Sequence, residues 1–275
     1  MKRARLPDGT PLWSDEPLGV ATVWDEISAY FEAGESVRAG ETVFDVGANI
    51  GLFSIAALRQ SSGGARIWSF EPIPATFAVL AANARLLDSA GEQWLPVRAG
   101  LGAKNELALL HFFPRLSVLS GRMRGSKQAR RELDELLAGE HIGAPFGFLN
   151  RIPRPIRRVL GAVVGVWALR SKPIVAQIWT LSEALEKFDV ARLDWLKIDV
   201  EGAELDVLRG IEAHHWPRIE RVILETESLA AAHDVTALLE ANGFAVEVRA
   251  NAVIQGGNLR LLLARRNPPQ EAPSE

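Results

Sequence analysis

Short apolar runs alternate along the chain with longer segments whose apolar residues recur at helical spacing. The run at 42–46 is β-branched and aromatic, which is typical of a buried strand. Gly47 and Gly51 follow it, and apolar positions then recur every three or four residues, which predicts a helix over 49–60. A strand, a glycine turn and a helix in this order form the opening unit of an α/β sheet.

The same succession returns along the chain. Further core strands are expected at 67–70, 94–101, 195–200 and 221–225, and an antiparallel pair at 244–249 and 259–265. Helices are expected at 74–88, 180–188, 203–211 and 235–242. The predicted fold class is therefore α/β, with a central, mostly parallel seven-stranded sheet, helices on both faces and an antiparallel C-terminal edge.

The stretch at 115–172 interrupts this succession, between an extra strand at 106–113 and a strand at 174–179. It contains a charged helix at 130–137 and, behind a basic flank, an apolar segment at 159–169. That segment is too short to span a bilayer as a helix. A membrane-surface helix, a dimer contact and a lid over a ligand pocket all fit the pattern. We favour a helical lid, because insertions in such folds usually build the second ligand's site.

The length of 275 residues suits one domain with an insertion. We expect an N-terminal segment at 1–40, the main domain at 41–266 and a disordered tail at 267–275. The chain has no cysteine, which excludes disulfides, thiol nucleophiles and zinc–thiolate sites. The N-terminus carries charges without an apolar run behind them, which argues against a signal peptide and for the cytoplasm.

The net charge of −3 conceals an asymmetry. The stretch at 115–172 holds 12 basic and 4 acidic residues, and the remainder of the chain is acidic. A basic segment on an acidic body indicates either an anionic partner or a solvated helical face. A carrier protein, a phosphorylated ligand or a lipid surface would be such a partner. Nucleic acid is disfavoured, because the acidic body would repel a long phosphate backbone.

The glycine turn narrows the choice of ligand. Dinucleotide sites use Gly-x-Gly-x-x-Gly, with the middle glycine against a pyrophosphate. Here Asp45, Gly47 and Gly51 are spaced differently, and Asn49 stands at the middle position. The spacing suits a ligand without a pyrophosphate, such as S-adenosyl-L-methionine, whose charged end would meet the helix N-terminus. A tight turn without any ligand is the alternative.

A second strand ends in an acid, which makes nucleoside binding more probable. Glu71 lies 26 residues beyond Asp45, about one β-α-β step. A carboxylate at that position can accept hydrogen bonds from both ribose hydroxyls. The alternative is a solvated strand-end acid before Pro72, which starts the next helix.

These motifs resemble the FkbM-type S-adenosylmethionine-dependent methyltransferases. The resemblance rests on residues 44–51, 70–74 and 196–205 and covers about 6–266. Residues 114–121 also match members that tailor polyketides and peptides. The resemblance implies a Rossmann-like class I methyltransferase with S-adenosyl-L-methionine as its cofactor. Many members have Lys-Ser where this chain has Gly202 and Ala203, a difference on the acceptor side.

Acids at the carboxyl ends of the strands are the candidate chemistry. In an open α/β sheet, ligands bind at these ends, beside the point where the strand order reverses. Asp45 is expected to orient the turn, Glu71 to hold the ribose, and Asp199 and Glu201 to lie near the methyl group and act as base or orienting group for a hydroxyl. Asp199 has a competing interpretation as an ion pair with Lys197. The predicted cofactor-binding residues are Asp45, Gly47, Asn49, Gly51, Glu71, Pro72, Gly100, Leu101 and Asp199, with Gly100 and Leu101 beside the adenine.

Three further residues are weaker candidates. A helix around 24–31 is expected over the cofactor site, where Glu26 or Tyr30 would reach the methionine end of the cofactor; solvent exposure of Glu26 and packing of Tyr30 are favoured instead. His111 lies in an apolar strand and is more often structural than a base. Three acids at one edge suit Mg²⁺, but nothing in the sequence requires it, and we predict no metal site.

The leading hypothesis is O-methylation of a hydroxyl on a small-molecule or carrier-protein-bound natural-product acceptor. The acceptor class rests on the resemblance alone. A nucleotide-dependent oxidoreductase is disfavoured by the missing middle glycine. A non-catalytic S-adenosylmethionine-binding module and methylation of a membrane lipid or glycan remain alternatives. The oligomeric state does not follow from the sequence.

Overall fold

The structure is a computed structural model of the chain. It describes residues 1–15, 20–31, 35–112, 172–200, 202–226, 228–250 and 260–268. The predicted lid and its segments at 130–137 and 159–169 lie outside these residues, and so does nearly all of the predicted tail. Among the helices that are described, none combines the length and the apolar character needed to cross a membrane.

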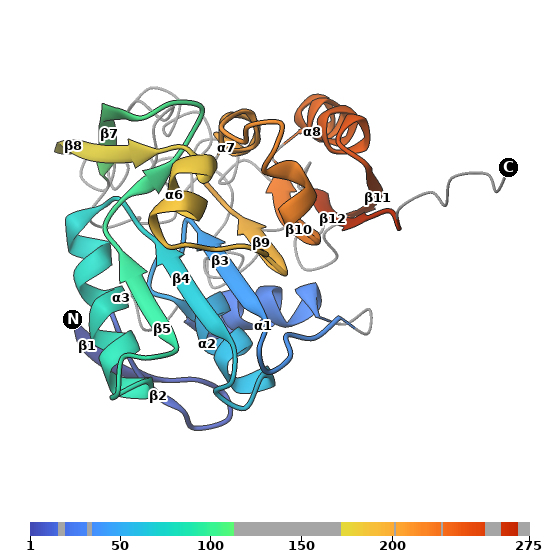
Figure 1. Ribbon diagram of the computed structural model, residues 1–275. Helices are drawn as coiled ribbons and strands as arrows, with labels where there is room; N and C mark the ends of the chain where they lie inside the picture. Colours follow the sequence, from blue (N-terminus) through green and yellow to red (C-terminus); the bar gives the residue numbers. More distant parts are fainter. Residues whose placement is uncertain are drawn as a thin grey trace, which may run out of the picture.

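A seven-stranded sheet forms the centre of the molecule (Figure 1), in the order β11-β12-β10-β9-β3-β4-β5. β10, β9, β3, β4 and β5 pair in parallel, whereas β12 pairs antiparallel with β10 and β11, so the sheet is mixed. The strands are β3 (Thr42–Val46), β4 (Arg66–Phe70), β5 (Trp94–Val97), β9 (Trp195–Ile198), β10 (Arg221–Thr226), β11 (Phe244–Ala250) and β12 (Arg260–Arg266). This arrangement confirms the Rossmann-like α/β class, and the antiparallel edge lies where the sequence predicts it.

Helices cover both faces of the sheet because its strands are apolar on both sides. Side chains of α1 (Val20–Tyr30), α2 (Leu52–Gln60) and α3 (Pro74–Leu87) share a core with Val43 and Ile67. On the other face, α6 (Leu181–Lys187), α7 (Glu204–Arg209) and α8 (Leu229–Ala241) share a core with Phe44 and Phe70. Successive β3 side chains point to opposite faces. Asp45 therefore points to the face that α2 covers.

Two smaller sheets flank the main one. β1 (Lys2–Arg5) and β2 (Pro11–Ser14) form an N-terminal hairpin, which the sequence does not predict. β6 (Gly100–Leu101), β8 (Lys172–Trp179) and β7 (Glu106–Phe112) form a three-stranded sheet with its own apolar cluster. The predicted strand over 94–101 is therefore wrong in extent: β5 ends at Val97, and residues 100–101 pair with β8 instead.

Two predicted helices begin at other residues than expected. α2 begins at Leu52 rather than at residue 49, because Asn49 and Gly51 have positive φ angles of 51° and 92°. α8 begins at Leu229, six residues before the predicted start, where the Ser228 side chain accepts a hydrogen bond from the Ala231 amide. α6 begins where predicted, with Thr180 as its N-cap. The Thr180 side chain accepts the Glu183 amide, and the Thr180 amide donates to Asn105 instead of the Glu183 side chain that would complete a capping box.

Candidate active site

The turn after β3 is fixed by the protein itself. The amides of Gly47 and Ala48 both donate to the Phe70 carbonyl at 3.0 Å. The Asn49 amide donates to the Glu71 carboxylate at 3.1 Å. These amides already have acceptors on β4 and at its end. The carboxylate that the turn binds through the Asn49 amide is thus Glu71, a residue of the protein itself.

Gly47 lies against the backbone that follows β9. Its φ is 75°, and a Cβ atom built there would lie 1.8 Å from the Asp199 carbonyl oxygen. Backbone of the protein thus occupies the space that a side chain at Gly47 would need, and binding of a cofactor by Gly47 stays a prediction. The turn and Asp199 are consequently held in direct contact.

Gly51 has a packing role. A Cβ atom at this position would lie 2.5 Å from the Trp94 ring and 2.7 Å from Leu80. The missing side chain lets the start of α2 approach α3 and β5 closely. Binding of a cofactor by Gly51 stays a prediction, and the packing alone accounts for a glycine there.

Glu71 lies at the carboxyl end of β4, as predicted. Its two carboxylate oxygens accept hydrogen bonds from the amides of Asn49 (3.1 Å) and Ile73 (2.9 Å). Burial raises the pKa of Glu71 to about 7, and the two amides and Lys197 oppose that rise only in part. Two directional donors thus orient a nearly buried carboxyl group at the end of the strand next to β3.

Asp45 is fully buried and belongs to a hydrogen-bonded chain below the turn. Lys197 Nζ lies 3.1 Å from Asp45 Oδ1, and Ser54 donates to Asp45 Oδ2 at 2.6 Å. Ser54 contacts Ser69 at 2.6 Å, and Ser69 accepts the indole N–H of Trp94 at 2.7 Å. These contacts connect β3, α2, β4, β5 and β9. Asp45 reaches the turn through Lys197, which also donates to the Gly47 carbonyl, and its orienting role stays a prediction.

Lys197 connects the buried aspartate to the predicted catalytic one. Its Nζ lies 3.4 Å from Asp199 Oδ2 and donates to the Gly47 carbonyl at 3.0 Å. Burial would lower the pKa of Lys197, but Asp45 and Asp199 outweigh that effect and raise it. The ion pair that the sequence offers as an alternative for Asp199 is thus present. The Asp199 side chain is still 40% exposed, so it remains accessible to a ligand.

Two further acids gather around Asp199. Burial raises the pKa of Glu26, on α1, to about 7, and the charges of Asp199 and Asp25 add to the effect. Burial and Asp199 likewise raise the pKa of Glu225, at the end of β10, to about 7. The Tyr30 hydroxyl donates to Glu225 Oε1 at 2.9 Å. Glu26, Asp199 and Glu225 form what we call the acid cluster.

The acid cluster changes the interpretation of the N-terminal helix. Packing of Tyr30 is confirmed, because the residue is 5% exposed. Solvent exposure of Glu26 is wrong, since burial and Asp199 dominate its surroundings. Glu225 is the last residue of the strand that the sequence predicts at 221–225. The sequence also places a helix at 24–31 over the site, but it gives no sign that Glu26 is held beside Asp199.

Other predicted site residues fall in different places. Gly100 lies against Pro72, since a Cβ atom there would be 3.4 Å from that ring and 2.8 Å from Ile178. Leu101 is buried beside it in β6. Both residues belong to the small sheet, and their contact with adenine stays a prediction. His111 lies in β7 opposite Pro173, in the small sheet. Glu201 lies outside the described residues.

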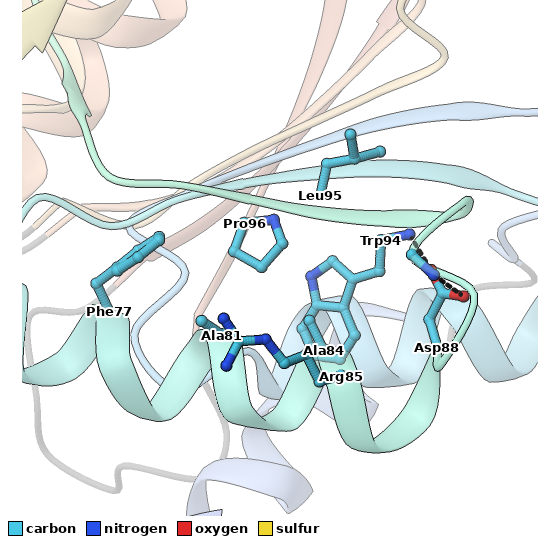
Figure 2. A pocket seen from close by; sticks show the side chains of 9 residues that line it. Phe77, Ala81, Ala84, Arg85, Asp88, Trp94, Leu95 and Pro96 are labelled. Atoms are coloured by element: carbon cyan, nitrogen blue, oxygen red, sulfur yellow. Dashed lines mark hydrogen bonds between the residues drawn. The ribbon is translucent and has the colours of Figure 1, made fainter.

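A separate hollow lies between α3 and β5 (Figure 2). It has a volume of about 330 Å³, and Figure 2 shows the Trp94 and Pro96 side chains of β5 facing α3, whereas Leu95 points to the other side of the strand. Asp88, at the end of α3, accepts the Trp94 amide at 2.8 Å and closes one end. The hollow lies toward the amino end of β5, whereas Glu71 and Asp199 follow the carboxyl ends of their strands. It is therefore not part of the candidate active site.

Sequence reasoning does not find the polar residues that brace the site from within. Ser54 and Ser69 read as ordinary helix and strand residues, and Trp94 as an apolar one. Glu204, 5% exposed, accepts the Gly202 amide at 2.9 Å, and burial raises its pKa. The sequence does contain one sign of this contact. Glu204 stands two residues after Gly202 at the start of a predicted helix, where carboxylates often accept hydrogen bonds from free amides.

The arrangement favours a ligand with a hydroxyl-bearing part and a cationic part. Glu71 offers an oriented hydrogen-bond acceptor at one side of β3. On the other side, the acid cluster sets three carboxyl groups against the single lysine Lys197 among the residues described around it. Carboxyl groups with pKa values near 7 can also accept a proton at neutral pH.

Comparison with known proteins agrees with this geometry. A family model described as the methyltransferase FkbM domain matches residues 45–246. The 31-O-demethyl-FK506 methyltransferase FkbM of Streptomyces tacrolimicus is 30% identical over 266 residues, 95% of this chain and 96% of that protein. Methyltransferase sdnD of Sordaria araneosa is 32% identical over 227 residues, 82% of this chain and 81% of that protein.

A solved structure supports the fold. The methyltransferase FkbM of Methylobacillus flagellatus superposes with a TM-score of 0.51 at 13% identity, covering 92% of this chain and 56% of that one. At this identity the likeness concerns the fold alone. The family model, in contrast, spans most of the sequence, and the relatives align over most of their length. The chain therefore belongs to the FkbM methyltransferase family and is a methyltransferase.

Proposed function

We propose that the protein uses S-adenosyl-L-methionine to methylate a hydroxyl on a small-molecule or carrier-bound natural-product acceptor. One observation carries the proposal: Glu71 and Asp199 flank the turn after β3, from the two strands that neighbour β3. The strand order reverses between β3 and β9, which is where open α/β sheets bind their ligands.

The described residues fit this cofactor. Glu71 is oriented to accept hydrogen bonds from ribose hydroxyls, as a carboxylate at this strand end does in nucleoside sites. The acid cluster suits the positive charges of a sulfonium and an ammonium group, because opposite charges attract strongly where water is partly excluded. When bound, the cofactor supplies an activated methyl group with a good leaving group.

The protein's own task is to position the acceptor hydroxyl and to remove its proton. Asp199 is held by Lys197 and keeps an accessible carboxylate, so it can orient an acceptor hydroxyl or take its proton. Glu201 is proposed for the same role from its place in the sequence. Glu26 and Glu225, with pKa values of about 7, are further proton acceptors next to Asp199.

The acceptor class rests on the relatives. The Streptomyces tacrolimicus relative is by its name a methyltransferase of 31-O-demethyl-FK506, so that protein acts at an oxygen. We propose an oxygen of a comparable natural product for this chain.

Asp199→Asn tests the chemistry. We expect the variant to bind S-adenosylhomocysteine within about threefold of wild type and to lose transfer of labelled methyl by 10²-fold or more, as is typical for loss of a general base. Mass spectrometry of candidate acceptors after incubation with isotope-labelled S-adenosylmethionine measures the transfer. Asp206→Asn, at a partly exposed acid of α7, is the matched control.

Retention of full transfer in Asp199→Asn would remove Asp199 from catalysis and leave the cofactor assignment intact. Absence of any S-adenosylhomocysteine binding to the wild-type protein would instead overturn the cofactor itself. The two measurements thus separate the binding step from the chemical step.

Glu71 predicts a pH dependence of cofactor binding. Its pKa of about 7 in the free protein means that its ionised form, the better acceptor, prevails only above neutral pH. Affinity for S-adenosylhomocysteine should therefore fall as pH drops through 7, by up to about tenfold per pH unit, and level off above it. Calorimetric titrations between about pH 5.5 and pH 8.5 measure this slope.

Glu71→Gln keeps one acceptor oxygen and removes the titrating group. It should weaken binding by about tenfold at high pH, since a hydrogen bond to a charged acceptor contributes about 1.5–3 kcal/mol. It should also reduce the slope of the pH profile to the part that Glu26 and Glu225 contribute. Glu212→Gln, at an exposed acid with a 67% exposed side chain, should leave the profile unchanged. An unaltered slope in Glu71→Gln would assign the proton to another group.

A further inference from the structure

A second cluster of titratable side chains lies at the opposite ends of the strands from the candidate active site. Glu186 is in the last turn of α6, and His214 and His215 lie in the turn before the short 3₁₀ helix Trp216–Arg218. Residues 193 and 219 form a parallel bridge just before β9 and β10, so both segments reach the amino ends of these strands. Asp199 and Glu225, in contrast, lie at the carboxyl ends.

The three side chains converge on one point. One potential ligand atom from each of Glu186, His214 and His215 lies within 4.8 Å of the other two. His215 Nε2 is 3.8 Å from Glu186 Oε1. Around a zinc ion with bonds of about 2.0–2.1 Å, ligand atoms stand roughly 3.4 Å apart. Rotation of the side chains can bring the ligand atoms to the separation that zinc requires, because Glu186 and His214 are 62% and 57% exposed.

His215 gives an independent indication of a ligand. Its side chain is completely buried, and its Nε2 lacks a hydrogen-bond partner among the described residues. Its Nδ1 lies 2.9 Å from the Ser182 hydroxyl, which also accepts the Glu212 amide at 2.8 Å. Ser182 therefore fixes the ring and directs Nε2 toward Glu186. A hydrogen bond to the second nitrogen is how metal-ligating histidines are usually oriented.

We propose that Glu186, His214 and His215 bind one divalent cation of the zinc class. Two imidazoles and one carboxylate suit Zn²⁺ or Co²⁺, whereas Mg²⁺ and Ca²⁺ prefer oxygen ligands alone. The chain has no cysteine that would compete for such an ion. The ion would tie α6 to the turn before β10 and satisfy the buried nitrogen. The sequence predicts no metal, because these ligands meet only after folding.

The charges around the cluster support this assignment on balance. Burial, His214 and Arg218 lower the pKa of His215, which keeps the ring in the neutral form that a metal requires. Arg218 repels a dication. Glu186 and Glu212, whose Oε2 lies 3.6 Å from His214 Nδ1, bring two negative charges that offset this repulsion.

The experiment uses the full chain after treatment with a chelator. Calorimetric titration with Zn²⁺ should show one saturable equivalent, and Co²⁺ should give a visible absorption spectrum that Zn²⁺ abolishes. At about 100 times the Kd, Zn²⁺ should raise the midpoint of thermal unfolding by roughly 5 °C. Glu186→Gln and His214→Ala alter exposed residues and should each weaken Zn²⁺ binding by at least about tenfold.

His233→Ala is the matched control, because His233 is an 85% exposed histidine on α8 and its loss should leave Zn²⁺ binding unchanged. Absence of a saturable equivalent would overturn the proposal, as would equal affinities in wild type, Glu186→Gln and His214→Ala. Binding of S-adenosylhomocysteine should stay the same in all these variants. The outcome is therefore independent of the proposed function.

Discussion

Gly47→Ala should abolish binding of S-adenosylhomocysteine and destabilise the fold by about 4 kcal/mol or more. A positive φ at a non-glycine residue costs about 1 kcal/mol or more. The new Cβ atom would also lie 1.8 Å from the Asp199 carbonyl oxygen, an overlap that only a backbone shift relieves. The turn after β3 must then move away from β9, and Glu71 loses the Asn49 amide, one of the two that orient it. Calorimetry and denaturant unfolding measure the two effects.

Gly63→Ala separates backbone strain from crowding. Gly63 has a φ of 77°, close to the 75° of Gly47, and a Cβ atom there would meet no described atom within 4 Å. It should cost only about 1 kcal/mol and leave S-adenosylhomocysteine binding intact. If Gly47→Ala behaved like Gly63→Ala in both measurements, the contact between the turn and Asp199 would have no part in shaping the site.

Lys197→Met should destabilise the protein by about 3–5 kcal/mol, the usual cost of removing one partner of a buried ion pair. Methionine fills a similar volume, so the main effect is electrostatic. It leaves Asp45, which is fully buried, without its cation, and Glu26, Asp199 and Glu225 without the positive charge between them. Urea unfolding at neutral pH measures the change in free energy.

The double variant Asp45→Asn with Lys197→Met should recover most of the lost stability, because the fully buried Asp45 then carries no unpaired charge. Arg249→Met provides the surface control: Arg249 pairs with Glu247, whose side chain is 61% exposed, and its loss should cost less than about 1 kcal/mol. Equal losses in Lys197→Met and Arg249→Met would show that the buried pair has no special role in stability.

The sequence predicts the centre of the fold because the signals there are local. The apolar run of β3, the glycines after it and the spacing of α2 all lie within 20 residues, so each can be recognised without knowledge of the fold. The small sheet is different. Gly100 and Leu101 continue the apolar pattern of β5, and only their pairing with β8, far along the chain, removes them from the main sheet. Non-local pairing of this kind leaves no mark in a short window.

In the candidate site, too, features with local signals are predicted and features that depend on distant residues are not. The strand-end positions of Glu71 and Asp199 follow from the alternation of strands and helices, and both lie where the sequence places them. The functions of Gly47 and Gly51 do not follow from the spacing, since the atoms that crowd them belong to β9, α3 and β5. The sequence places a helix at 24–31 over the site, but it favours solvent exposure for Glu26, whereas burial and the nearby Asp199 dominate its surroundings.

The amides of the glycine turn are bonded to the protein before any ligand arrives. A recognition loop that is disordered in the free state must lose conformational entropy on association, which weakens the complex. Here Phe70 and Glu71 hold the Gly47, Ala48 and Asn49 amides in the free protein. The glycine turn is therefore preorganised, and cofactor binding does not require it to become ordered first.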